Sequence, residues 1–125
     1  MKDKPCIDRA IIDKLVELGG TGLLQKMLAI FLENTPGKIL IIQEGLAVGD
    51  YPAIANAAHS LLSSTGNIGA QQLYALCHTI EQKARQRDED ELPRLIEALP
   101  TSYQALMEAL AHLKDEKQYE TNRSG

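Results

Sequence analysis

Residues 51–87 read YPAIANAAHSLLSSTGNIGAQQLYALCHTIEQKARQR, and the spacing of their apolar residues indicates the fold class. Its first half carries one apolar stripe at helical spacing, formed by Ile54, Ala58, Leu61, Thr65 and Ile68. Gly69 is then a natural place for the helix to stop. A second stripe follows it, formed by Leu73, Leu76, Cys77, Ile80 and Ala84. Two amphipathic segments joined by so short a connection predict a tight antiparallel helical hairpin.

The chain before the hairpin is also helical by its periodicity. Asp8 can cap a short first helix, which Gly19 and Gly20 then stop. Thr21 can cap the next helix, whose apolar positions are Leu23, Leu24, Met27, Leu28, Phe31 and Leu32. Pro36 interrupts this pattern, but proline is tolerated in the first turn of a following helix. The segments on either side of Pro36 can therefore form one kinked rod.

A last helix follows the hairpin. Asp88 or Asp90 can cap it, and its apolar stripe continues on both sides of Pro100, which should kink or restart it. Residues 118–125 show no apolar period and are predicted to form a disordered tail. No strand pattern, repeat or linker is visible. We therefore predict an all-α fold, an up-down antiparallel four-helix bundle with a short extra N-terminal helix, as one domain over residues 1–117.

Composition and charge limit the possible functions. A chain of 125 residues fits a single domain, and a net charge of −4 gives no basic surface for nucleic acid or anionic lipid. Cys6 and Cys77 are too few for a disulfide framework, and the place of Cys77 on an apolar stripe predicts a reduced, buried thiol. No secretory signal opens the chain, and its most apolar run, residues 39–48, is too short to span a bilayer. We expect a soluble cytoplasmic protein without membrane contact.

Several familiar chemistries have little support. Glu108 and His112 are a single i, i+4 pair, whereas a di-iron bundle needs two Glu-x-x-His motifs, so no metal site is expected. The sequence GGTG at 19–22 lacks the lysine and the preceding strand of a phosphate-binding loop. Composition leaves a Ser-His-Asp set open, but nothing resembles a nucleophile elbow. Nucleotide binding and hydrolysis are therefore not predicted.

Among the histidines, His78 and His112 fall on faces that should be solvated, and no role is assigned to them. His59 also lies on an outer face, where a lone histidine is often an accident of the surface. Its helical neighbours there are Ala55, Asn56, Leu62, Ser63 and Gly66. A glycine inside a helix costs about 1 kcal/mol relative to alanine, so stability does not explain Gly66. The small residues instead predict a patch that another protein approaches closely.

Residues 58–81, AHSLLSSTGNIGAQQLYALCHTIE, resemble the histidine-containing phosphotransfer (Hpt) domain, whose pattern is roughly A-H-x-L-K-G-S-S-x-x-(I/L)-G-A-x-x-L-x-x-L-C-x-x-(I/L)-E. The likeness extends outward over most of the chain. It implies a helical bundle that accepts a phosphoryl group on His59 from a receiver-domain aspartate and passes it to another receiver domain. The receivers would belong to response regulators or hybrid histidine kinases. The resemblance also implies a monomer without cofactor, ATP site or kinase activity, with Mg²⁺ on the receiver.

The resemblance assigns a second site residue. An imidazole whose Nδ1 hydrogen is held by a partner has Nε2 free to attack phosphorus. Many family members place a glutamine where this chain has Glu81, which can accept the same hydrogen bond but also repels phosphate. Alternatively, Glu81 is an ordinary surface residue paired with Arg85 at i+4.

Two departures from the family pattern leave alternatives open. The family's lysine three residues past the histidine is Leu62, and its next glycine is Ser63. Loss of the lysine removes a positive charge near the phosphoryl group and exposes an apolar side chain. One alternative is therefore an adaptor bundle that docks onto receiver domains without carrying phosphate, and another is a purely structural bundle. The sequence also does not tell whether the chain is free-standing or the C-terminal module of a hybrid kinase.

Overall fold

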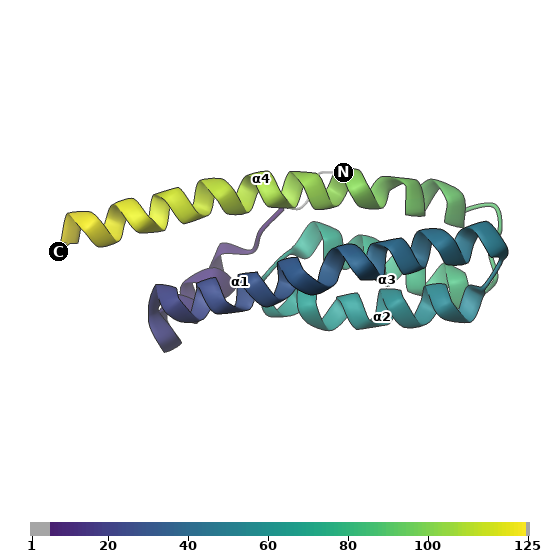
Figure 1. The fold of residues 1–125 in the computed structure, drawn as a ribbon, viewed down its shortest axis with the longest axis horizontal. Helices are drawn as coiled ribbons and strands as arrows, with labels where there is room; N and C mark the ends of the chain where they lie inside the picture. The colour runs from purple at the N-terminus through teal and green to yellow at the C-terminus, as the bar shows by residue number, and fades with distance from the viewer. Residues whose placement is uncertain (1–5, 125) are drawn as a thin grey trace.

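The computed structural model describes the backbone of residues 6–124 and the side chains of residues 6–113. It consists of four helices, α1 (Arg9–Val48), α2 (Tyr51–Asn67), α3 (Gln71–Arg85) and α4 (Leu92–Ser124). Successive helices run in opposite directions, and α4 extends past the other three at its C-terminal end (Figure 1). No strand occurs among the residues described. The predicted all-α, up-down bundle is confirmed.

Helix α1 consists of two segments that meet at Gly20. Gly20 has φ 72° and ψ −174°, a conformation outside the helical region that glycine adopts without a Cβ clash. The segment before it is the predicted short N-terminal helix. Asp8 caps this segment by accepting a hydrogen bond from the backbone N–H of Ala10 at 3.1 Å. Thr21, predicted as the cap of the next helix, is the residue with which the second segment begins after Gly20.

Pro36 also lies inside α1, so the two segments that flank it form one rod. Proline lacks an N–H, which leaves the carbonyl of Leu32 without its usual helical donor. Both residues are exposed, so water can satisfy that carbonyl. The helix is therefore not interrupted at Pro36, because the missing hydrogen bond lies on its solvent side.

Because α1 is unbroken at Pro36, its apolar stretch is longer than the run of residues 39–48 suggested. By length and composition alone, α1 is apolar enough to cross a membrane, with a mean hydropathy of 1.4 over an 18-residue window that is 11% buried. The core helices of soluble proteins pass the same test. The feature is therefore weak evidence for a membrane span.

The turn between α1 and α2 brings these two helices into close contact. Gly49 ends α1 with φ 74°, and its N–H donates to carbonyl oxygens in the last turn. Asp50 then caps α2 by accepting from the backbone N–H of Ala53 at 3.1 Å. Gly45 lets the helices approach, because a Cβ there would lie 2.9 Å from Cγ1 of Ile54. The α1–α2 connection is thereby fixed by both capping and packing.

The hairpin predicted over residues 51–87 is formed by α2 and α3. Gly69 reverses the chain between them with φ 73°. Its carbonyl accepts a hydrogen bond from the backbone N–H of Asp8 at 2.7 Å, which ties the N-terminal segment to the turn. Cys77 is fully buried on α3, and burial raises the pKa of its thiol to about 12. The predicted burial of the Cys77 thiol is confirmed.

Asp88 precedes α4, and its carboxylate accepts hydrogen bonds from the backbone N–H groups of Asp90 and Glu91 at 3.1 and 3.0 Å. Of the two predicted caps, Asp88 is therefore the one used. Helix α4 continues through Pro100 and is assigned as far as Ser124. The domain boundary at residue 117 and the disordered tail over residues 118–125 remain predictions.

Candidate functional site: His59 and its partners on α3

His59 lies on the outer side of α2, with 67% of its side chain exposed. The opposite side of α2 is buried against the rest of the bundle and includes Ile54, Ala58, Leu61 and Thr65. This packing fixes the rotation of α2 about its axis. The imidazole is therefore held at the border between α2 and α3, with one side open to solvent.

Glu81 of α3 contacts the ring. Its carboxylate oxygens lie 3.2 and 3.1 Å from Nδ1 of His59, and only 12% of its side chain is exposed. Arg85, one turn further along α3, donates from Nε and Nη2 to Oε2 of Glu81 at 3.0 and 2.7 Å. The two alternatives for Glu81, ring partner and surface ion pair, are thus both realised by one carboxylate.

These contacts set the charge of Glu81 and the tautomer of a neutral ring bonded to it. Partial burial alone would raise the Glu81 pKa, but the hydrogen bonds from Arg85 and His59 outweigh it and lower that pKa below its ordinary value. Glu81 is therefore a carboxylate at neutral pH and can only accept hydrogen bonds. A neutral imidazole bonded to it must carry its hydrogen on Nδ1. Nε2 then has no hydrogen, and its lone pair is free.

The five residues predicted to receive a partner are not equivalent. Asn56 and Ser63 are exposed, whereas Leu62 and Gly66 are half-buried. Ala55 is only 2% exposed, so it adds almost no surface to the patch around His59. Its angular position beside His59 on one helix does not reveal this burial, which depends on how α2 packs against its neighbours.

Tyr74 is a part of this surface that the sequence did not single out. It lies on α3, is 40% exposed, and stands next to Gly66, where a Cβ would meet its ring carbons at 3.6 and 3.7 Å. Its exposure could have been inferred from the sequence, because Tyr74 lies off the apolar stripe of α3, just after the turn. The small patch beyond His59 is therefore bordered by an aromatic ring.

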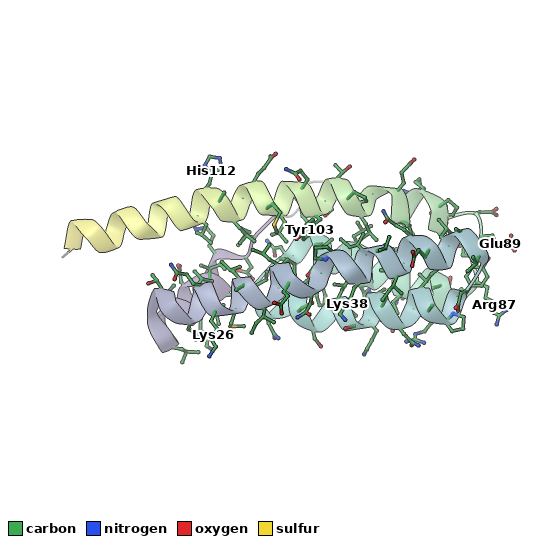
Figure 2. All side chains as sticks on the ribbon, viewed as in Figure 1. Lys26, Lys38, Arg87, Glu89, Tyr103 and His112 are labelled. Atoms are coloured by element: carbon green, nitrogen blue, oxygen red, sulfur yellow. The ribbon has the colours of Figure 1, made fainter. Side chains whose placement is uncertain are left out.

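The other candidate residues stay apart from this site. His78 and His112 are exposed as predicted, and His112 projects from the outer side of α4 (Figure 2). Across residues 6–113, no three His, Cys, Asp or Glu side chains come together in a way that could hold a metal ion.

The model of the Hpt domain family matches residues 26–113, which include His59, Glu81 and most of the bundle. This match covers more than half of the chain. The chain belongs to the Hpt domain family. Hpt domains are phosphotransfer carriers that work with the receiver domains of two-component systems, and they are not kinases. This chain is accordingly a phosphotransfer carrier in a phosphorelay.

Similar proteins agree with this membership. The chain is 24% identical over 109 residues, 87% of its length, to the aerobic respiration control sensor protein ArcB of Escherichia coli (strain K12) and of Shigella flexneri. The match spans 14% of the length of these sensor proteins. The crystal structure of histidine-containing phosphotransfer protein B from Pseudomonas aeruginosa PAO1 has the same fold, with a TM-score of 0.80 and 24% identity over 94% of this chain and 98% of that one.

Proposed function

We propose that this Hpt domain carries its phosphoryl group on Nε2 of His59. The observation that carries the proposal is the contact between Nδ1 of His59 and the Glu81 carboxylate, on a ring that is 67% exposed. The carboxylate selects the tautomer in which Nε2 is the nucleophile. The exposure of the ring lets another protein bring an aspartyl phosphate to that nitrogen.

The transfer is a displacement at phosphorus. The Nε2 lone pair attacks the phosphorus atom, an N–P bond forms, the P–O bond of the aspartyl phosphate breaks, and the receiver's aspartate leaves as a carboxylate. Such a reaction depends mainly on in-line positioning and on neutralisation of charge. Glu81 supplies the positioning by fixing the ring. Arg85 reduces the repulsion between the Glu81 carboxylate and the incoming phosphate, since it pairs with Oε2.

The remaining roles fall to the partner. Response regulators or hybrid histidine kinases would supply the receiver domains, and their receivers would supply Mg²⁺ for charge neutralisation. The Hpt chain itself would act in the cytoplasm as a monomer, without an ATP site and without binding nucleic acid or membrane. Asn56, Leu62, Ser63 and Gly66 would form the receiver-docking surface around the ring.

A transfer assay with two phosphodonors tests the proposal. One donor is a panel of purified receiver domains phosphorylated on aspartate, and the other is phosphoramidate, a small donor that needs no docking surface. We expect both donors to place an acid-labile, base-stable phosphate on the wild-type chain. On His59→Gln, which should keep its helicity and melting temperature, we expect none from the receivers and only slower labelling from phosphoramidate, because His78 and His112 are also exposed. Labelling of His59→Gln at the wild-type rate would exclude His59 as the acceptor. Receiver binding without any phosphorylation of the wild-type chain would favour the adaptor alternative.

A further inference from the structure

A hollow of about 270 Å³ adjoins the His59 site at the N-terminal end of α2. Its lining includes Tyr51, Pro52, Ala55, Asn56, Arg85 and Arg87. Ala55 and Asn56 precede His59 by about one helical turn, and Arg85 is the residue that holds Glu81. The hollow is therefore continuous with the site, on the side of His59 opposite to Leu62. The charged side chains in its lining are both arginines.

Arg87 adopts a backbone conformation that is unfavourable for arginine. Its φ is 55°, and it is the one non-glycine residue with positive φ within the described part of the chain. Its N–H donates to the carbonyl of Ala84 at 3.0 Å, and the N–H of Asp88 donates to the carbonyl of Lys83 at 3.0 Å. This pair of bonds ends α3 in a Schellman motif, in which glycine usually occupies the position of Arg87. The arginine is thus kept at a site where glycine would fold more easily, which indicates a use for its side chain.

The two guanidinium groups are available at the surface. Arg87 lies at the end of the bundle where α3 passes into α4 (Figure 2), and its Cζ is 5.8 Å from the centroid of the Tyr51 ring, one wall of the hollow. Arg85 is 55% exposed and uses Nε and one N–H of Nη2 for Glu81. A guanidinium has five N–H donors, so Arg85 can bind a further acceptor without releasing Glu81.

Acidic residues of the neighbouring turn do not neutralise this lining. Asp88 is paired with Lys83, and Glu91 with Arg94. Glu89 and Asp90 are exposed in the turn beyond Arg87 and do not line the hollow. Because Glu81 already pairs with Arg85, the net positive charge of this lining beside His59 is that of Arg87, in a chain whose net charge is −4.

We infer that Arg85 and Arg87 bind carboxylate side chains of the receiver domain beside its phosphorylated aspartate. The inference rests on the proposed function, which brings an anionic aspartyl phosphate and its surroundings against His59. Complementary charges on the two surfaces would orient the receiver and speed its association. The arginines would thereby supply, from one side of His59, the positive charge that Leu62 does not supply from the other.

Arg87→Gly and Arg87→Asn test the inference, because both residues tolerate the left-handed conformation and neither carries charge. Arg94→Gln is the matched control, since Arg94 is 69% exposed on α4 and its replacement also removes one positive charge. The probes are phosphoramidate and the receiver domain that transfers fastest to the wild-type chain. Melting temperature and the transfer rate are measured at about 0.05 M and about 0.5 M salt, where screening differs strongly.

The Arg87 variants should melt at the wild-type temperature or above it, yet accept phosphate from the receiver about three- to fivefold more slowly at low salt. The deficit should shrink at high salt, and phosphorylation by phosphoramidate should not change. Arg94→Gln should behave as wild type with both donors. Wild-type transfer by the Arg87 variants at low salt would overturn the inference, as would an equal loss with both donors or a clear loss of stability. Failure of the wild-type chain to be phosphorylated by either donor would instead refute the proposed function.

Discussion

Gly66→Gln asks whether the face beyond His59 must stay small for a receiver to reach the ring. Gly66 lies within α2, and its φ is outside the left-handed region, so a side chain is allowed there. A Cβ would lie 3.6 and 3.7 Å from two ring carbons of Tyr74, which is ordinary van der Waals contact. The rest of the glutamine side chain would extend over the surface where the receiver is proposed to dock.

The structure sets the expected effect on stability. Replacing a helical glycine by glutamine gains about 0.5–1 kcal/mol of intrinsic helix propensity, and the contact with Tyr74 does not oppose it. For a domain of this size, that gain raises the melting temperature by about 2–4 °C. Stability and activity should therefore change in opposite directions.

The assay compares Gly66→Gln with Gly22→Gln. Gly22 is also inside a helix, is exposed, and has open space where its Cβ would be built, but it lies on α1. Both variants should be stabilised, whereas only Gly66→Gln should slow transfer from a phosphorylated receiver, by about tenfold if a near-attack geometry is lost. Phosphoramidate should phosphorylate both variants at the wild-type rate.

Two outcomes would contradict the hypothesis that a receiver needs a small residue at position 66. If Gly66→Gln is stabilised and transfers from the receiver as fast as Gly22→Gln, the receiver does not approach over this face. If Gly66→Gln unfolds the chain, the space beside Tyr74 is needed for folding, and small size at this position says nothing about a partner.

Three further predictions concern single side chains. Leu62→Lys should speed transfer from a receiver at low salt and lose part of that gain as salt screens the charge; no gain at any ionic strength would show that charge at this position is not limiting. Glu81→Ala should slow single-turnover transfer about fivefold, which corresponds to a loss of about 1 kcal/mol of hydrogen bonding in the transition state. Glu81→Gln keeps an acceptor for the Nδ1 hydrogen and should slow transfer less. Equal slowing by the two variants would contradict the orienting role of Glu81. Gly45→Ala should destabilise the bundle by about 1–3 kcal/mol in chemical denaturation, because its Cβ would lie 2.9 Å from Cγ1 of Ile54. An unchanged stability would show that α1 and α2 can move apart at this contact without cost.

Most of the fold could be predicted because its signals are local. Asp8, Asp88 and the turn glycine Gly69 act where the sequence places them, and the apolar stripes of α2 and α3 fix the buried faces. The sequence allowed one rod through Pro36 but did not decide it, since the continuity of α1 depends on the missing hydrogen bond falling on the solvent side.

The site was predictable to the extent that one helix face defines it. The spacing of α2 places Asn56 and Ser63 on the exposed face with His59. The burial of Ala55 and the position of Tyr74 depend on how α3 packs against α2, a contact between residues far apart in sequence. The same holds for Arg87, whose left-handed backbone follows from the way α3 ends.

We propose that Nε2 of His59 carries the phosphoryl group because Glu81 holds Nδ1. Nuclear magnetic resonance of the phosphorylated chain, with ¹⁵N-labelled histidine and ³¹P detection, tests it most directly, since it identifies the nitrogen bonded to phosphorus. We expect a single phosphorus resonance coupled to Nε2 of His59, with the hydrogen retained on Nδ1. Phosphorus on Nδ1 of His59, on His78 or His112, or on a residue other than histidine would contradict it.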